Sequence, residues 1–342
     1  MIVVMAVSAA EEEIRQVVSA IEAQGLSAQQ MPGGDRVAVG IPSAIPPDMR
    51  EPLYQRLSVL PGVDHVAHVS RPYKLASREF HRNDTIVEVK GIPFGGQRIQ
   101  IIAGPCSVEN LDQMHLAAAA ARSVGANVLR GGAFKPRTSP YAFQGLQEKG
   151  LKILQQVGND HGLLTISEVM QPDLVPLVAS YVDILQIGAR NMQNFPLLIE
   201  AGKSGRPVML KRGPSATLDE FLLAAEYLLH ESNSKVLLCE RGVHPLDRSY
   251  TRNTLDLNAV PVLKEVSHLP VIADPSHGIG VSRHVPAMAL ASIAAGADGI
   301  MLEMHPNPRE ALSDGAQSLT PAQLEALMPR LRSVAAAIGR SA

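Results

Sequence analysis

The spacing of hydrophobic residues divides the chain near residue 75 into two parts with different patterns. In residues 1–75, apolar positions alternate with polar ones over short stretches and recur every three or four residues over longer ones. The first spacing is typical of strands buried on one face, and the second of amphipathic helices. The order strand–helix–strand–helix–strand predicts a small ferredoxin-like (ACT-like) α/β sandwich. The expected strands are Ile2–Val7, Arg36–Ile41 and Val63–Ser70, and the expected helices are Glu11–Gln24 and Pro52–Leu60.

The second part repeats one unit of an apolar strand, a polar or glycine-containing loop and an amphipathic helix. Eight such units in about 250 residues predict a (β/α)8 TIM barrel. A doubly wound open sheet is the alternative, but the chain lacks the glycine fingerprint of a dinucleotide site. We therefore expect a regulatory or oligomerisation domain at 1–75, a connector with a barrel-bottom hairpin at 76–98, and a catalytic barrel at 99–342. The expected barrel strands are Gln100–Ala103, Asn127–Arg130, Leu163–Ser167, Ile184–Ile187, Pro207–Lys211, Val236–Glu240, Val271–Ala273 and Gly299–Glu303.

Composition excludes several classes of function. The formal net charge is −2, tryptophan is absent and aromatic residues make up 4% of the chain. Such a chain offers neither a basic field nor stacking platforms for nucleic acid. It has no apolar stretch of about 20 residues that would span a membrane. The two cysteines cannot form a disulfide framework and the N-terminus lacks a secretory signal, so we expect a cytoplasmic protein.

Charged residues gather where the barrel strands are expected to end. In TIM barrels the reactive groups lie at the C-terminal ends of the strands, here called the barrel mouth. Cations converging there repel one another, so we expect a small ligand with several negative charges to neutralise them. The cations in question are Arg130, Lys135, Arg137, Arg190, Lys211 and Arg241.

A second set at the strand ends has the chemistry of metal ligands. Cys106, His277, Glu303 and Asp314 offer one thiolate, one imidazole and two carboxylates, which suit Mn, Fe, Co or Zn. These residues are far apart in the sequence, so only closure of the barrel would bring them together. Cys239 lies inside an apolar strand and is expected in the core.

Two other chemistries are open to the same residues. Lys135 or Lys211 could form a Schiff base, as in an aldolase. Cys106 and His277 could form a thiol nucleophile pair, although the neighbouring carboxylates favour a metal.

Long motifs in the chain resemble those of 3-deoxy-D-arabino-heptulosonate 7-phosphate (DAHP) synthases, of type Iβ with an N-terminal ferredoxin-like domain. The resemblance covers essentially the whole chain. The motifs are GPCSVEN, RGGAFKPRTSPYAFQGLQEKGL, QIGARNMQNFPLL, VMLKRG, CERGVH, RNTLDLNAVPVLKE, ADPSHG and MLEMHPNPREALSDGAQSL.

The resemblance implies a metal-dependent condensation of phosphoenolpyruvate with erythrose 4-phosphate and water, which releases phosphate and opens the shikimate pathway to aromatic amino acids. It also implies a homotetramer. It assigns the metal to Cys106, His277, Glu303 and Asp314, and phosphoenolpyruvate to Arg130, Lys135, Ala189, Arg190, Lys211 and Arg241. It assigns erythrose 4-phosphate to Lys135, Pro136, Arg137 and Thr138. As a mechanistic hypothesis built on these assignments, we expect Lys135 to donate a proton to the forming alkoxide and Glu168, at the end of the third strand, to position the attacking water.

The nearest competing class is 3-deoxy-D-manno-octulosonate 8-phosphate synthase, which uses arabinose 5-phosphate. That class typically has a KANRS-type segment where this chain reads KPRTS at 135–139, which favours the four-carbon aldose. A third class, a non-catalytic amino-acid-binding regulator with a decayed barrel, is disfavoured because both polar sets are complete.

Regulated members of the subtype bind an aromatic amino acid through the N-terminal domain. The stretch 27–32 corresponds to the family's second strand, where regulated members carry His and Ser. This chain has Gln29 and Met31 there, which weakens the expectation of a tyrosine or phenylalanine effector.

Overall fold

The computed structural model describes residues 1–32, 36–67, 72–135, 139 and 141–342. Its chain divides into two compact units. One comprises Met1–Asp84 with Glu265–His268, and the other comprises Thr85–Lys264 with Leu269–Ala342.

The N-terminal unit is a four-stranded antiparallel sheet in the order β2-β3-β1-β4. The central strand β1 is buried along its whole length because two helices cover the sheet. Helix α1 turns Ile14, Val17 and Ile21 into the resulting core. The predicted ferredoxin-like fold is confirmed. The elements are β1 (Ile2–Met5), α1 (Glu11–Glu22), β2 (Gln29–Pro32), β3 (Val37–Gly40), α2 (Pro47–Ser58) and β4 (Val63–Ala67).

Two details of this unit differ from the sequence prediction. Hydrophobic spacing predicted three strands, but β2 is a fourth, and its partly polar sequence gives no strand signal because it pairs only with β3 at the sheet edge. Helix α2 was predicted to start at Pro52, yet it starts at Pro47. Either proline suits a first helical turn, and Pro52 is tolerated one turn further on.

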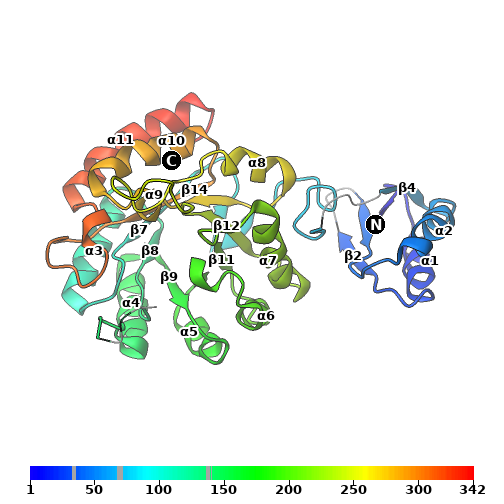
Figure 1. The fold of residues 1–342 in the computed structure, drawn as a ribbon, viewed down its shortest axis with the longest axis horizontal. Helices are drawn as coiled ribbons and strands as arrows, with labels where there is room; N and C mark the ends of the chain where they lie inside the picture. Colours follow the sequence, from blue (N-terminus) through cyan, green and yellow to red (C-terminus); the bar gives the residue numbers. More distant parts are fainter. Residues whose placement is uncertain (33–35, 68–71, 136–138, 140) are drawn as a thin grey trace. The chain divides into compact units, whose positions relative to one another are not determined.

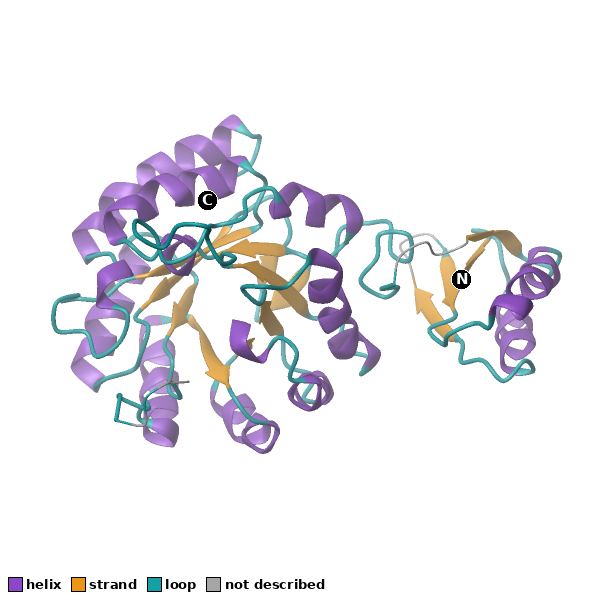
Figure 2. Cartoon of the chain, in the orientation of Figure 1, coloured by secondary structure: helices purple, strands orange, loops and turns teal. Residues whose placement is uncertain are grey.

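The larger unit is a closed barrel of eight parallel strands in the order β7 to β14 (Figure 1). The helices lie around the outside of the ring of strands (Figure 2). The predicted TIM barrel is confirmed, and each predicted strand overlaps an observed one. The strands are β7 (Gln100–Gly104), β8 (Val128–Arg130), β9 (Leu164–Val169), β10 (Ile184–Ile187), β11 (Val208–Lys211), β12 (Val236–Glu240), β13 (Val271–Ala273) and β14 (Gly299–Glu303).

The helices that follow these strands are mostly amphipathic, with their buried residues turned to the barrel. No helix in the described part of the chain is both long and apolar enough to cross a bilayer. The helices are α3 (Leu111–Ser123), α4 (Gln147–His161), α5 (Val175–Tyr181), α6 (Phe195–Lys203), α7 (Leu218–His230), α8 (Ala259–Val266), α9 (Pro275–Ile279), α10 (Val285–Ala294) and α11 (Pro321–Ala337).

A short hairpin closes the barrel end opposite the mouth. Strands β5 (Val87–Val89) and β6 (Ile92–Phe94) are joined by Lys90 and Gly91, whose φ angles of 47° and 82° give a two-residue turn that suits strand twist. Val87, Val89 and Phe94 belong to the same buried cluster as barrel residues from Ile102 to Met301, Cys239 among them. Hydrophobic side chains therefore fill the interior of the barrel at this end.

The connector segment at 72–84 packs within the N-terminal unit against the end of α8. His268 Nε2 donates to the carbonyl oxygen of Leu75 at 2.7 Å, and the His268 ring lies 4.6 Å from that of His81. Burial lowers the pKa of His268 from 6.5 to about 4, the Leu75 carbonyl opposes this, and His81 and Arg78 add to it. The folded state therefore favours neutral His268.

Acidification is expected to loosen this segment. The pKa of His268 is lower in the folded state than in the unfolded chain. The neutral side chain therefore contributes its full stabilisation of the folded state above pH 6.5, and this stabilisation is lost as the pH falls toward 4. The loss amounts to about 3 kcal/mol. Hydrogen exchange of peptides from 72–84 should rise more between pH 7 and pH 5 in the wild type than in His268→Gln, which keeps a donor but does not titrate. An equal rise in hydrogen exchange in the two proteins, after correction for intrinsic exchange rates, would contradict this account.

Candidate active site at the barrel mouth

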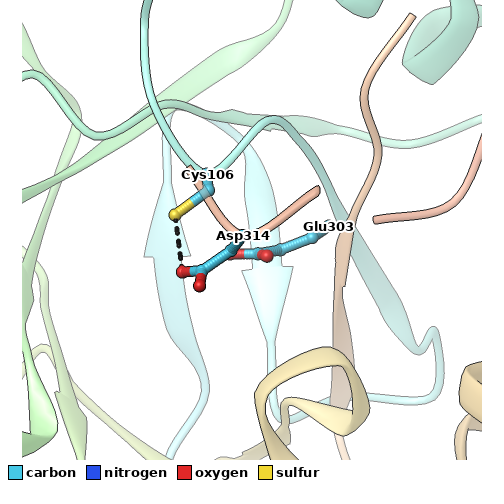
Figure 3. A group of neighbouring side chains, drawn as sticks. All are labelled: Cys106, Glu303 and Asp314. Carbon is cyan, nitrogen blue, oxygen red and sulfur yellow. Dashed lines mark hydrogen bonds between the residues drawn. The ribbon is translucent and has the colours of Figure 1, made fainter. Parts of the chain in front are cut away.

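Three potential metal ligands meet where β7 and β14 end. Cys106 follows β7, Glu303 is the last residue of β14, and Asp314 lies in the loop beyond it. Their ligand atoms all lie within 4.8 Å of one another, as Figure 3 shows. Cys106 Sγ lies 3.1 Å from Asp314 Oδ2. Adjacent parallel strands thus bring together residues that are about 200 positions apart in the sequence.

His277 approaches this cluster from α9, the short helix after β13. Asp274 caps the helix: its Oδ1 accepts the backbone N–H of His277 at 3.0 Å, and its Oδ2 lies 2.8 Å from His277 Nδ1. The bond to Asp274 places the ring proton on Nδ1 and leaves Nε2 as an acceptor, 3.3 Å from Glu303 Oε1. Burial lowers the pKa of His277, although Asp274 and Glu303 oppose this. A neutral imidazole facing a carboxylate is an arrangement that a bound cation stabilises.

The four side chains fit a divalent metal by their chemistry and their placement. Burial, with Glu303 adding to it, raises the pKa of the Cys106 thiol to about 11, while Lys135 and Arg130 oppose this. Such a thiol is a poor nucleophile without a metal, which disfavours the thiol-pair alternative. A metal that binds Cys106 must displace its proton, so affinity should rise with pH.

The cations of the mouth are partly neutralised by the protein itself, which corrects the expectation that only a ligand would do so. The guanidinium of Arg130 forms an ion pair with Glu303, and Lys211 Nζ lies 2.5 Å from Asp274 Oδ2. All four groups are buried. The error arose because the sequence prediction counted cations without pairing them with carboxylates two strands away in the barrel.

The other described cations leave positive charge at the cavity. Arg241 is buried and has no carboxylate within ion-pair distance among the described residues. Burial lowers the pKa of Arg241, the Arg252 charge contributes to this, and Asp274 opposes it. Lys135 Nζ donates to the carbonyl oxygen of Cys106 and lies the same 2.9 Å from its Sγ.

A cavity of about 370 Å³ opens beside the metal ligands. Its volume and charge suit a small anion. Cys106, Arg130 and Glu303 lie beneath it, since each is less than 5% exposed. The predicted site residues that line the cavity are Lys135, Glu168, Ala189, Arg190, Lys211, Arg241, His277 and Asp314. Pro136, Arg137 and Thr138 lie outside the described residues.

Glu168 is held at the cavity wall by its neighbours. It is 9% exposed, and its Oε2 lies 3.5 Å from Gln186 Nε2 on the adjacent strand. A Cβ atom at Gly188 would overlap the Glu168 carboxylate, so a larger residue there would force this side chain to move.

Several polar residues of the site were not singled out from the sequence, among them Asp274, Arg252 and Gln317. Asp274 stands at the end of the seventh strand, a placement that could have marked it. Arg252 and Gln317 lie in loops after β12 and β14, where hydrophobic spacing carries no signal.

Comparison with known proteins agrees with this geometry. The family model described as DAHP synthetase I family matches residues 84–339, and the one described as DAHP synthase ferredoxin-like domain matches residues 1–71. The chain is 45% identical over 339 residues to phospho-2-dehydro-3-deoxyheptonate aldolase of Thermotoga maritima, covering 99% of each protein. It is 33% identical over 262 residues to 2-dehydro-3-deoxyphosphooctonate aldolase of Syntrophobacter fumaroxidans, covering 71% of this chain and 90% of that protein.

Solved structures give the same result. The crystal structure of the Thermotoga maritima DAHP synthase superposes with a TM-score of 0.78 at 44% identity, covering 99% of this chain and 98% of the other. A truncated form of the synthase from that organism has a TM-score of 0.73 and covers 78% of this chain and 98% of its own.

Replacing Asp274 should weaken metal binding without touching a ligand atom. In Asp274→Asn, only one acceptor oxygen remains. The amide can then no longer accept the His277 backbone N–H on one atom while it accepts from His277 Nδ1 and Lys211 Nζ on the other, so the imidazole loses its orientation. We expect the Mn²⁺ dissociation constant of the metal-stripped protein to rise about 10- to 100-fold, measured from the free Mn²⁺ signal in electron paramagnetic resonance.

The matched control is Asp256→Asn, because Asp256 pairs with the buried Arg212 instead of a metal ligand. Its Mn²⁺ affinity should equal that of the wild type. If Asp274→Asn also bound Mn²⁺ normally, the assigned role of Asp274 would be wrong.

Proposed function

The chain belongs to the DAHP synthetase I family and has DAHP synthase activity, and we propose how its own side chains carry out that reaction. The reaction joins phosphoenolpyruvate to erythrose 4-phosphate and releases inorganic phosphate. The octulosonate alternative is not favoured, since two proteins named for it match 71% and 70% of the chain at 33% and 32% identity, against 99% of the chain at 45% for the heptonate relative.

One observation supports the proposal most directly: the potential metal-binding atoms form two close pairs beside a cationic cavity. Cys106 Sγ lies 3.1 Å from Asp314 Oδ2, and His277 Nε2 lies 3.3 Å from Glu303 Oε1. These four residues would hold a divalent metal such as Mn, Fe, Co or Zn. When bound, the metal supplies a Lewis acid for an aldehyde oxygen.

The cationic cavity would hold phosphoenolpyruvate. Arg190, Lys211 and Arg241 are assigned to its phosphate, because they line the cavity on neighbouring strands. Arg130 and Lys135 are assigned to its carboxylate, nearer the metal ligands. Ala189 lies at the start of a 3-10 turn in the same wall and is assigned to substrate contact.

Each chemical step has a group placed to support it. C3 of phosphoenolpyruvate forms a bond to the aldehyde carbon, and positive character grows at C2. Lys135, beside Cys106, would donate the proton that the new alkoxide takes up. Glu168 would hold the water that adds at C2, after which the C–O bond breaks and phosphate leaves.

The aldose, erythrose 4-phosphate, is assigned to the segment 135–138. This assignment of Lys135, Pro136, Arg137 and Thr138 rests on the KPRTS motif. A Schiff-base route is disfavoured, since Lys211 is ion-paired and Lys135 donates to two atoms of Cys106.

The remaining assignments follow from family resemblance. We propose a homotetramer in the cytoplasm at the entry of the shikimate pathway; both cysteines are free, which suits a reducing compartment. The N-terminal unit is proposed as the seat of regulation or assembly. Gln29 and Met31 are half-buried on β2 and Gln30 is exposed, so the first two share one face of that strand.

Substrate choice and metal dependence can be measured in one assay. Loss of the ultraviolet absorbance of phosphoenolpyruvate should occur with erythrose 4-phosphate, stop with EDTA and return with Mn²⁺. Arabinose 5-phosphate should give no turnover. Turnover with arabinose 5-phosphate instead would refute the assignment of the KPRTS segment, and turnover that resists EDTA would refute the metal.

A deletion tests the role of the N-terminal unit. We expect inhibition by tyrosine or phenylalanine, where the full chain shows it, to disappear after removal of residues 1–75, with the barrel still active. Inhibition that persists after the deletion would contradict an effector site in this unit. Absence of inhibition in the full chain would leave assembly as its role, measured by light scattering.

A further inference from the structure

Gln317 is a buried glutamine with both ends of its amide engaged at the metal site. It lies in the 3-10 turn Gly315–Gln317 and is 2% exposed. Its Nε2 donates to Glu303 Oε2 at 2.7 Å, and its Oε1 accepts from Arg252 Nη1 at 2.8 Å. A carboxylate only accepts and a guanidinium only donates, so these partners fix the orientation of the amide.

Arg252 completes a bridge between the two carboxylates. The same Nη1 donates to Asp314 Oδ1 at 3.0 Å. The path therefore runs from Glu303 through Gln317 and Arg252 to Asp314. We call this path the amide–guanidinium bridge.

The bridge occupies one oxygen of each carboxylate and leaves the other for the site. Glu303 Oε2 is taken by the bridge, while Oε1 faces His277 Nε2 and also accepts from Arg130. Asp314 Oδ1 is taken as well, while Oδ2 faces Cys106 Sγ. The two oxygens outside the bridge, Glu303 Oε1 and Asp314 Oδ2, are those that lie toward the other proposed ligands.

The two carboxylates differ in how firmly their backbones are held. Glu303 ends a barrel strand, whereas Asp314 lies in a loop with a φ of 54°, in the left-handed region. Such loop ligands need support from other side chains to keep their geometry. The bridge supplies that support by tying the loop ligand to the strand ligand.

We propose that Gln317 and Arg252 are positioning residues that orient the carboxylates of Glu303 and Asp314 and thereby set the affinity of the metal site. The proposal rests on the ligand set of the proposed function. Neither residue would contact the metal. Arg252 also lines the cavity, so the bridge reaches from the metal site to the substrate space.

Two variants that keep the net charge test the bridge. Gln317→Leu removes both hydrogen bonds at constant volume. Arg252→Lys keeps the cation, but its ammonium ends one atom short of the position of Nη1. We expect each to raise the Mn²⁺ dissociation constant of the metal-stripped full-length protein about tenfold, read from free Mn²⁺ by electron paramagnetic resonance.

The double variant separates a shared bridge from two independent defects. If both residues act through one bridge, the double variant Gln317→Leu/Arg252→Lys should have about the same Mn²⁺ dissociation constant as the single variant that binds Mn²⁺ less tightly. Losses that multiply would refute the bridge, as would single variants that stay within about twofold of the wild type.

Gln100 provides the matched control. It is also a buried glutamine with both ends engaged, donating to Pro93 O and accepting from Asn127 Nδ2, each at 2.8 Å, but it lies at the start of β7. Gln100→Leu should lower thermal stability and leave Mn²⁺ affinity unchanged. A loss of affinity in Gln100→Leu equal to that in Gln317→Leu would mean general destabilisation and would overturn the proposal.

The outcomes also distinguish this proposal from the proposed function. Wild-type protein that binds no Mn²⁺ would overturn the ligand set itself. Wild-type protein that binds one Mn²⁺ per chain, together with variants that bind equally well, would overturn only the bridge.

Discussion

The proposed metal site depends on one constraint: four ligand atoms from the ends of β7, β13 and β14 must be held close together. Two neutral or anionic acceptors 3.3 Å apart, such as His277 Nε2 and Glu303 Oε1, have no proton to share when the imidazole is neutral. A cation between such atoms removes the conflict. Asp274 orients the imidazole of His277, and the amide–guanidinium bridge orients the carboxylates of Glu303 and Asp314. These contacts keep the four ligand atoms directed toward one another. The proposed metal site would thus depend as much on the surrounding residues as on the ligands.

The barrel mouth contains both a cationic cavity and a cluster of buried carboxylates. Opposite charges form ion pairs around the mouth: Arg130 pairs with Glu303, Lys211 with Asp274, and Arg212 with Glu240. Taking such charges out of water costs several kcal/mol per ion, so each needs a partner in the folded state. The arrangement leaves Arg241 without a carboxylate partner in the described chain, facing the cavity. In the proposed function, an anionic substrate would therefore meet groups that the fold already holds in place.

Much of this structure could be predicted from the sequence, for an identifiable reason. Barrel strands are buried on both faces and appear as apolar runs, so all eight were found, and the segments at and after their ends gave the four proposed ligands and the cations. Hydrophobic spacing missed the edge strand β2, where Gln29, Gln30 and Met31 are at most half-buried, and only the family resemblance indicated a strand there. The ion pairs of Arg130 and Lys211 were missed because they join strands that lie two apart in the barrel. Gln317 and Arg252 depend on the paths of two loops, which no periodicity encodes.

The most direct test of this account is the absorption spectrum of the protein after its metal is replaced by Co²⁺. A thiolate bound to Co²⁺ gives an intense near-ultraviolet charge-transfer band. The band should appear in the wild type, persist in Cys239→Ala, whose thiol is buried in the barrel interior, and vanish in Cys106→Ala. A Co²⁺ complex without the band, or with a band that survives Cys106→Ala, would contradict the central claim that Cys106 joins the three other strand-end ligands around one metal.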